Sequence, residues 1–484
     1  MSSWLEKLAA RPQRSILLLS LLLLLAGNWI LPLTDRDEAR FGEASREMIQ
    51  RGDYVVPWFN GHWRFDKPVL IYWCQIASYR LLGDNDFAAR LPSVLFTAAT
   101  ALLLVRWGRR ISGDNKTGFL AGAMFVTALH VALIGRIATA DMAMIFFVTL
   151  AAWSGWELTR PENPSRKKWW WIFYIALALG FLAKGPVAWL PLGGMILGRA
   201  LRREHFRLPL SETAVGLCVA VALIALWGGP ALAQTGGQFW SVGMGEHVIH
   251  RSLGTINDHG PKGMLQYLAL MPLYFATFFA SFLPWSLRVP STLHRWWPER
   301  KRDDFGWYLL MNAAVVFVAF SLVKTKLPHY TMPAFPMISL WLARQISGDA
   351  QLPSWFGKRL ALMVTIILIV TLGGFSIARN HLLTLNLWNA AKPYVKAETK
   401  IGCFGYTEPS LVWRFRAGTT NCVTLAGAEQ AKDFLTNEPP FILVLPTDQL
   451  SMLPDTNGIL FSVRGLDLVK FKSLDLTAIV RVVK

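Results

Sequence analysis

Charged side chains concentrate in residues 35–73, directly after an apolar run near the start of the 484-residue chain. Breaking a bond between a sugar and a phosphate requires cations on the departing phosphate and, where the acceptor is a hydroxyl, a carboxylate that takes its proton. A divalent metal such as Zn, Mg or Mn can share the first task. Residues of these types are Asp35, Asp37, Glu38 and Asp66 as acids, Arg40, Lys67, Lys184 and Arg251 as cations, and Glu246 and His247 as metal ligands. Such a set is what an enzyme needs if its substrate is a lipid with an anionic headgroup.

Some of these residues also have a purely structural interpretation. Asp37 could cap a helix, and Arg40 could form a surface ion pair with Glu43 or Glu47. Asp86 precedes an apolar run and is interpreted as a helix cap. Composition alone leaves both interpretations of Asp37 and Arg40 open.

Asp141 and Lys184 interrupt apolar sequence, which makes them harder to explain structurally. In GRIATADMAM, Asp141 is predicted at the outer mouth of an apolar helix, where an unpaired carboxylate is costly. A salt bridge to Arg136 is the structural alternative. Lys184 in FLAKGP separates two short apolar runs and could instead extend its ammonium to the membrane interface.

Two further motifs combine polar and apolar residues. GEHVIHR holds His247 and His250, which are a weak metal signal and could be ordinary loop residues. KTKLPHYTMPAFP, residues 324–336, carries Lys, His and Tyr side chains that could be interface anchors. Neither motif is decisive alone.

The elements that must position these residues are membrane helices. Hydrophobic residues make up 53% of the chain and charged residues 17%. Backbone groups in hydrocarbon must bond to one another, so the apolar runs predict helices, about eleven of them spanning the membrane. The first run is too long for a signal-peptide core and is expected to be retained. The runs are residues 15–33, 87–105, 118–135, 142–158, 169–183, 186–198, 212–233, 265–287, 306–323, 327–343 and 360–377.

The net charge of +18 follows from topology. If the N-terminus is cytoplasmic, the loops on its side carry most of the Lys and Arg residues, as the positive-inside rule requires. The charge is spread over many loops, so no nucleic-acid partner is expected. Residues 35–73, the Glu246 loop and the tail are then predicted to lie outside the cytoplasm.

Two domains are predicted, a transmembrane catalytic domain of residues 1–385 and a periplasmic α/β domain of residues 386–484. The tail alternates short Val, Ile and Phe runs with Pro, Gly and Asp turns. Cys403 and Cys422 both fall in this tail and could pair in an oxidising compartment, whereas Cys74 and Cys218 are interpreted as packing thiols.

The charged stretch itself predicts two helices. One begins with Asp37 as its cap and ends near Gly52, with Phe41 and Met48 on its apolar face and its charged residues elsewhere. The second begins at Pro68 and runs to about Gly83. The first is expected to lie along the membrane surface.

The sequence resembles a known family over nearly its whole membrane part. DRDEARFGEASREMIQRGDYVVPWFNGHWRFDKPVLIYW is similar to the first outer loop of the protein mannosyltransferase superfamily of GT-C glycosyltransferases, and most similar to that of the bacterial lipid A aminoarabinose transferases. The likeness continues in order through ARLPS, RIATADM, FLAKGP, EHVIHR and KLPHYTMPAFP. An ordered run of motifs is far more specific than any one of them.

The resemblance implies a GT-C fold and the transfer of a sugar from a polyprenyl phosphate, with inversion, to lipid A or another envelope glycan. It also implies a bacterial inner membrane protein whose active site and tail lie in the periplasm. The expected partners are therefore the lipid-linked donor, this acceptor and membrane lipids, and the chain is expected to be a monomer. The roles implied are catalytic for Asp37, Arg40 and Asp141, phosphate-binding for Lys67, Lys184, Arg251 and Tyr330, and metal-binding for Asp66 and His247.

Departures from the family pattern leave the sugar and the acceptor open. Phe41 replaces the usual Tyr, and Val69 replaces the second Pro after Lys67. Three alternatives also remain: an enzyme like the protein O-mannosyltransferases, a transporter or flippase of lipid-linked sugars, and a scaffold whose tail recruits partners. A transporter would place ionisable groups at the membrane midplane, whereas here they gather at one predicted face.

Overall fold

The chain forms two compact units in the computed structural model, which describes residues 3–160, 162–201, 209–250, 264–348, 352–454, 456–467, 469 and 472–482. The helical unit comprises Met1–Ala26, Phe65–Ile71 and Pro92–Leu368. The sheet unit comprises Gly27–Arg64, Tyr72–Leu91 and Ile369–Lys484. Most of the charged first loop thus belongs to the same unit as the tail, while the predicted domain boundary after residue 385 stays a prediction.

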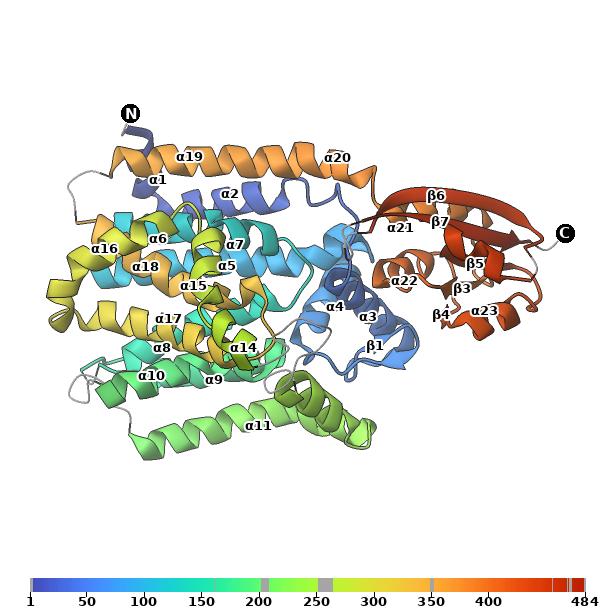
Figure 1. The fold of residues 1–484 in the computed structure, drawn as a ribbon. Coiled ribbons are helices and arrows are strands. Elements are labelled where there is room, and N and C mark those ends of the chain that lie inside the picture. The colour runs from blue at the N-terminus through green and yellow to red at the C-terminus, as the bar shows by residue number, and fades with distance from the viewer. Residues whose placement is uncertain are drawn as a thin grey trace. The chain divides into compact units, whose positions relative to one another are not determined.

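The helical unit is built almost entirely of helices (Figure 1). Within it α8 packs along α9, α10 along α17, and α6 against α2 and α18. The elements that lie wholly or mainly in this unit are α1 (Ser3–Ala10), α2 (Pro12–Leu25), α5 (Asp86–Ser112), α6 (Asn115–Thr127), α7 (Leu129–Ile134), α8 (Asp141–Leu158), α9 (Arg166–Lys184), η1 (Gly185–Trp189), α10 (Leu190–Leu201), α11 (Leu210–Gln234), α12 (Gln238–Trp240), η2 (Ser241–His250), α14 (Met264–Leu270), α15 (Leu273–Ser281), η3 (Ser286–Arg288), α16 (Val289–Trp296), η4 (Trp297–Lys301), α17 (Asp304–Leu322), η5 (Pro328–Ala334), α18 (Phe335–Ile346) and α19 (Ser354–Leu368).

Each of the eleven predicted apolar runs contains helix, so the predicted helical fold is confirmed. Five helices among the described residues are long and apolar enough to cross a membrane, and α1 with α2 adds a sixth if this pair, bent by 107°, is one span. The count of eleven spans stays a prediction. The five are Asp86–Ser112, Arg166–Leu201, Leu210–Gln234, Asp304–Leu322 and Ser354–Arg379.

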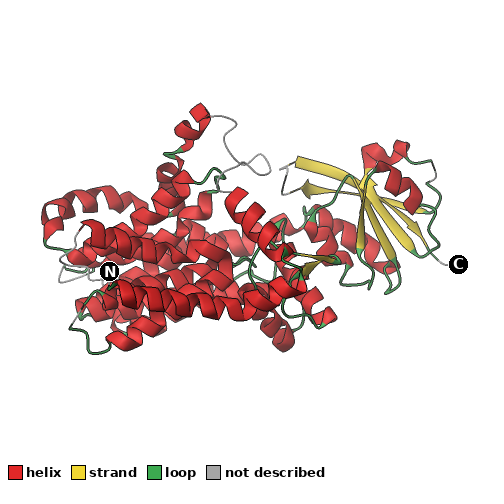
Figure 2. Ribbon diagram, turned by 90° about the horizontal axis from the view of Figure 1, so that it is seen from below, coloured by secondary structure: helices red, strands yellow, loops and turns green. Residues whose placement is uncertain are grey.

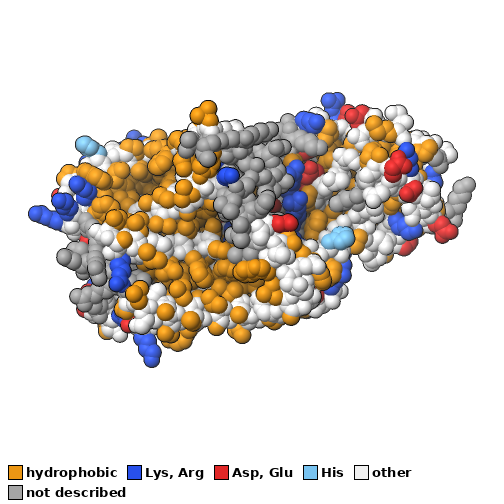
Figure 3. Space-filling model, turned by 60° about the horizontal axis from the view of Figure 1, so that its bottom comes forward, with side chains coloured by type: hydrophobic (Ala, Val, Ile, Leu, Met, Phe, Trp, Pro, Cys, Tyr) orange, Lys and Arg blue, Asp and Glu red, His pale blue; other side chains and the backbone are white. Residues whose placement is uncertain are grey.

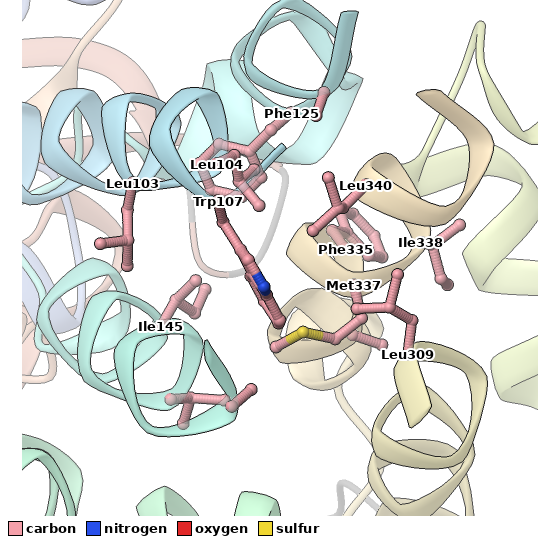
Figure 4. Packing of buried hydrophobic residues seen from close by; sticks show 14 of the residues in the cluster. Leu103, Leu104, Trp107, Phe125, Ile145, Leu309, Phe335, Met337, Ile338 and Leu340 are labelled. Carbon is pink, nitrogen blue, oxygen red and sulfur yellow. The ribbon is translucent and has the colours of Figure 1, made fainter. Parts of the chain in front are cut away.

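Aromatic and aliphatic side chains fill the space between these helices (Figure 4). Trp107 of α5 is fully buried, and its ring stacks on that of Trp153 with centroids 6.1 Å apart. Small residues let backbones approach, because a Cβ on Gly118 of α6 would lie 2.4 Å from the carbonyl oxygen of Val105 on α5. Lipid tails are as apolar as these side chains, so packing and close backbone contact must hold the helices together.

The outer surface of the helices is also apolar. Figure 3 shows hydrophobic side chains spread over a large part of the visible face, with one group of Lys and Arg side chains at its left-hand end. Leu226 of α11 and Leu362 of α19 are 75% and 56% exposed. Apolar residues exposed in this way suit contact with lipid rather than with water.

The sheet unit contains a five-stranded sheet, drawn in yellow in Figure 2, in the order β4-β3-β5-β7-β6. β3 pairs in parallel with β4 and β5, whereas β7 is antiparallel to β5 and β6. The elements of this unit are α3 (Asp37–Arg51), β1 (Trp58–Phe59), β2 (His62–Trp63), α4 (Leu70–Leu82, mainly here), η6 (Ile369–Gly374), α20 (Phe375–Arg379), α21 (Leu383–Ala391), η7 (Lys392–Tyr394), β3 (Lys400–Phe404), α22 (Pro409–Phe415), β4 (Val423–Ala426), α23 (Ala428–Phe434), β5 (Phe441–Pro446), η8 (Thr447–Met452), β6 (Ile459–Asp467) and β7 (Lys472–Arg481).

Both faces of the sheet are covered, which explains the continuous apolar run FILVLP of β5. Ile442 and Val444 pack in the cluster that contains α21 and α22, while Leu443 packs in the cluster that contains α23. Successive side chains of a strand point to opposite faces, so a strand buried on both faces must be apolar throughout. The predicted α/β character of the tail follows from this arrangement.

All four cysteines are free. Cys403 is buried in β3, whereas Cys422 is exposed just before β4. The structure thus contains no Cys403–Cys422 disulfide, because one thiol belongs to the sheet core and the other lies outside it.

Helix α3 is found where the sequence predicts it, but its surroundings differ from the prediction. It ends before Gly52, whose φ of +67° suits glycine. Asp37 is its first helical residue rather than its cap. Glu43, Arg46 and Glu47, expected on an exposed face, are buried because α22 of the tail packs against α3. The second helix, α4, begins at Leu70, two residues after the predicted Pro68.

Candidate functional site

A cavity of about 610 Å³ lies within the helical unit. Five of the predicted site residues line it, although they come from separate parts of the sequence. The cavity also contains His329, which the sequence analysis left as an interface anchor. The five are Asp66, Lys67, Asp141, Lys184 and Tyr330.

Lys184 and Asp141 form the charged centre of this cavity. Asp141 is the first residue of α8 and Lys184 the last of α9, two helices that pack along each other. The ammonium donates a hydrogen bond to the Asp141 carboxylate, and the two side chains are 17% and 13% exposed. Burying a carboxylate together with a cation costs far less free energy than burying either charged group alone.

The structural alternative for Asp141 is wrong. Arg136, its expected partner, donates instead to the backbone carbonyls of Ala26, Leu23 and Ala132. Lys184 bonds Asp141, and its position relative to a membrane interface stays a prediction. Gly185, with a φ of +78°, then directs the chain from α9 into η1.

Lys67 supplies a second cation to the cavity. It is half-buried in the short segment before α4, and its Nζ donates to the backbone carbonyl of Asp66 at 3.0 Å. Phe65, directly before this pair, packs edge-on against Phe239 with ring centroids 5.4 Å apart. The aromatic contact fixes the segment that presents both charged residues to the cavity.

Tyr330 and His329 reach the cavity from η5. The Lys184 ammonium lies 5.9 Å from the centroid of the Tyr330 ring, at the outer limit of a cation–π contact. Tyr330 also packs on Phe320, with ring centroids 4.9 Å apart. His329 interacts electrostatically with Asp141. His329 follows Asp141 by 188 positions in the sequence, so no local spacing connects the two residues, and sequence reasoning did not select His329 for the site.

The rest of the wall is mostly apolar. It includes aromatic rings, two of which pack edge-on, Trp227 and Phe239, with centroids 5.1 Å apart. A few convergent charges in a largely apolar concavity are typical of a site for an amphiphilic ligand. The apolar part of the lining includes Met144, Phe181, Leu190, Val221, Ile224, Leu232, Trp240, Phe320, Val323 and Pro333.

The predicted catalytic residues Asp37 and Arg40 lie on α3 in the sheet unit. Asp37 is exposed and Arg40 is half-buried. Their neighbour Glu38 is buried and accepts two hydrogen bonds from Arg90, at 2.7 and 2.8 Å. Arg90 also donates to backbone carbonyls before α3, so this pair anchors the start of the helix. The relation of Asp37 and Arg40 to the cavity stays a prediction.

Two predicted residues cannot be placed. Arg251 and the side chain of His247 lie outside the described residues. Within the described part of the chain no three His, Cys, Asp or Glu residues form a group that could hold a metal. Of the two predicted metal ligands, only Asp66 has a described side chain. The metal site predicted for Asp66 with His247 therefore stays a hypothesis.

A second charged group, missed by sequence reasoning, is buried in the sheet unit. Glu43 is fully buried and accepts from Arg46 and Arg416, each at 2.7 Å. Arg416 also donates to Gln50 at 3.0 Å, and the Arg46 guanidinium lies 3.6 Å from the centroid of the Trp413 ring. Glu43 and Arg416 are 373 positions apart, so no local spacing could have revealed this cluster.

Two more acids tie the first loop to the tail within the sheet unit. Asp86, interpreted as a helix cap, accepts from the indole of Trp413 at 2.9 Å and from Arg414 at 2.6 Å. Asp35 accepts from the backbone and the hydroxyl of Ser410. Burial raises the pKa of Asp35 to about 6, although the bonds from Ser410 oppose this shift. Asp35 and Asp86 thus have structural partners.

Comparison with known proteins gives sequence relatives and a matching family. Residues 66–227 match the family described as dolichyl-phosphate-mannose-protein mannosyltransferase. The undecaprenyl phosphate-alpha-4-amino-4-deoxy-L-arabinose arabinosyl transferase of Pectobacterium carotovorum is 31% identical over 71% of this chain and 64% of its own length. The enzyme of that name from Pectobacterium atrosepticum is 30% identical over 68% and 59%. The chain thus aligns with less than two thirds of either relative.

The fold is shared more completely than the sequence. The crystal structure of ArnT from Cupriavidus metallidurans bound to undecaprenyl phosphate matches with a TM-score of 0.77 over 96% of this chain and 97% of that one, at 16% identity. The Archaeoglobus fulgidus oligosaccharyltransferase matches with a TM-score of 0.53 over 90% and 68%, at 11% identity. The chain is thus similar in sequence to the aminoarabinose arabinosyl transferases and, over residues 66–227, to the protein mannosyltransferase family, and it shares the fold of ArnT.

Proposed function

We propose that this chain is a membrane glycosyltransferase that moves a sugar from a polyprenyl phosphate, such as undecaprenyl phosphate, to lipid A or another envelope glycan. The observation that carries this proposal is the cavity of the helical unit, in which Lys67, Lys184 and Asp141 meet an apolar wall. A polyprenyl phosphate has the matching chemistry, a long apolar chain that ends in an anion. The names of the sequence relatives support the same donor class.

The proposed setting is the bacterial inner membrane, crossed about eleven times. The N-terminus is cytoplasmic in this proposal, and the cavity and tail face the periplasm. The bias of Lys and Arg toward alternate loops supports this orientation. A periplasmic site is also where an envelope glycan is accessible.

The lysines act on the departing phosphate. When the bond between the anomeric carbon and the phosphate oxygen breaks, its electron pair stays on that oxygen, and Lys67 and Lys184 stabilise the charge. An ammonium has three donors, so Lys184 can contact the phosphate while it keeps its bond to Asp141. Asp141 thereby holds the Lys184 ammonium in place, and Tyr330 and Arg251 complete the phosphate site.

The acceptor is assigned to Asp37 and Arg40. An acceptor oxygen attacks the anomeric carbon from the face opposite the phosphate, which inverts its configuration. If the acceptor is a phosphate of lipid A, its oxygen is already anionic, and Asp37 with Arg40 orients it. If the acceptor is a hydroxyl, Asp37 takes its proton. A metal bound by Asp66 and His247 would add a further positive charge near the phosphate, and no step depends on it.

A protein acceptor is the second candidate. The matched family is described as a protein mannosyltransferase, and its match, residues 66–227, contains the charged cavity residues Lys67, Asp141 and Lys184. Both candidates use the same donor chemistry and differ only in the acceptor. Identifying the molecule that receives the sugar therefore distinguishes the two candidates.

Mass spectrometry of lipid A, other envelope glycans and glycoproteins from cells with and without the chain tests this proposal. We expect a sugar-sized mass increase that is present with the wild type and lost or strongly reduced with Asp37→Asn. Lys168→Gln, on an exposed residue outside the cavity, is the matched control that should retain the product. A modified glycoprotein would select the second candidate, and no added sugar on any glycan or protein would contradict both.

A further inference from the structure

A second groove in the helical unit lies between α1, α2 and α19, far along the sequence from the residues of the cavity. Its volume is about 500 Å³. Leu18 and Leu22 of α2 line it and are 56% and 53% exposed. The remaining apolar lining consists of Trp4, Leu8, Leu19, Phe119, Leu360, Ala361 and Val364.

Three cations stand at this groove. Lys7 lies in α1, Arg11 in the junction between the two helices, and Arg14 in the first turn of α2. Because α1 and α2 are bent by 107° to each other, three charges close in sequence are presented to one groove. All three side chains are exposed.

These cations differ from other basic residues of the helical unit. Arg110 pairs with Glu157, Arg166 with Glu212 and Arg344 with Asp303. Within the described residues, the side chains of Lys7, Arg11 and Arg14 have neither a carboxylate nor another hydrogen-bond partner. Three uncompensated charges of one sign beside an apolar channel repel each other, and an anion between them would relieve this repulsion.

We propose that this groove is a binding site for an anionic phospholipid. One acyl chain lies against Leu18, Leu22 and Leu360, and the phosphate headgroup contacts Lys7, Arg11 and Arg14. Basic pockets between membrane helices favour anionic headgroups, and the apolar lining favours a lipid over a soluble phosphate. The site is separate from the proposed donor cavity and does not depend on the proposed function.

Native mass spectrometry of the full-length protein in detergent, titrated with phosphatidylglycerol, tests this site. We expect the triple variant Lys7→Gln, Arg11→Gln, Arg14→Gln to bind phosphatidylglycerol more weakly, by about fivefold for each cation removed. Phosphatidylcholine, with no net charge, should bind weakly to both proteins. The matched control Lys167→Gln, Lys168→Gln, Arg295→Gln removes three exposed cations outside the groove and should bind like the wild type.

A second variant keeps the test decisive if the triple variant does not fold. Ala361→Trp fills the apolar part of the groove from an exposed position and changes no charge. It should reduce phosphatidylglycerol binding, because the acyl chain loses its place. Wild-type binding by Ala361→Trp would overturn the proposal, as would equal losses in the triple variant and its control.

Discussion

Each unit contains one group of buried charged residues, and the two groups differ in whether they face a cavity. In the sheet unit, Glu43 is 0% exposed and is enclosed by Arg46 and Arg416. In the helical unit, Asp141 meets Lys184 at the wall of a cavity of about 610 Å³, and the cavity also contains Lys67. The first group is closed by protein on all sides, whereas the second faces space for a ligand. An enclosed cluster of charged residues stabilises the fold, whereas a cluster that faces a cavity can also bind a ligand.

Removal of the closed cluster should give the largest effect on stability. Arg416→Ala leaves Glu43 buried with a single cation, and a broken buried pair costs about 3 to 5 kcal/mol. We expect a clear fall in the midpoint of thermal unfolding of the detergent-solubilised protein. Arg464→Ala is the control, because its ion pair with Asp475 is exposed and is worth at most about 1 kcal/mol. Equal midpoints for the two variants would show that the closed cluster does not support the fold.

Removal of the open cluster should separate activity from stability. Lys184→Met removes a cation from the proposed phosphate site and is expected to lower sugar transfer by about 100- to 1,000-fold. It also leaves Asp141 without its partner, so the unfolding midpoint should fall as well. The double variant Lys184→Met, Asp141→Asn should recover the midpoint without recovering transfer. Recovery of both would mean that the pair serves only the fold.

Lys67 tests the same cavity with less structural cost, because it is half-buried and bonds a backbone carbonyl. Lys67→Ala should weaken donor use by about 1.5 to 3 kcal/mol, the value of one charge-assisted contact to a phosphate. The effect should appear in kcat/KM for the donor, while the unfolding midpoint stays near that of the wild type. Unchanged donor kinetics would remove Lys67 from the phosphate site.

The smallest expected effect is a pH dependence in the sheet unit. The pKa of Asp35 is raised by burial to about 6, so folding favours its protonated form. The stability from this group is present at low pH and is lost as the pH rises from about 4 to about 6, at most about 3 kcal/mol. Burial also raises the pKa of Glu43, to about 7, so both acids make the unfolding midpoint of the wild type fall with pH across this window. Asp35→Asn should reduce the slope, and an unchanged slope would remove Asp35 from this pH dependence.

The sequence predicts the elements of the fold well where the signal is local. Apolar runs locate the membrane helices, and Gly52 marks the end of α3, because hydrophobic periodicity and backbone conformation depend on neighbouring residues. The resemblance to GT-C enzymes is confirmed by the family match and by the fold. It also selected Lys67, Asp141 and Lys184, which no spacing rule connects and which the structure brings to one cavity.

What could not be predicted depends on contacts between distant parts of the chain. The charged residues of α3 suggested an exposed surface helix, but their partner Arg416 follows 373 positions after Glu43. Asp86 suggested a cap, but it accepts from Trp413 and Arg414. A pattern of charges along one helix cannot distinguish contact with water from contact with a remote guanidinium.

The central claim is that the open cluster of the helical unit holds a lipid-linked phosphate. Binding of undecaprenyl phosphate and of undecaprenol, which lacks the phosphate, to the purified full-length protein tests it most directly. The account predicts that the wild type binds the phosphorylated lipid much more tightly, and that the double variant Lys67→Ala, Lys184→Met loses this preference. Equal binding of both lipids by the wild type, or an unchanged preference in the double variant, would contradict it.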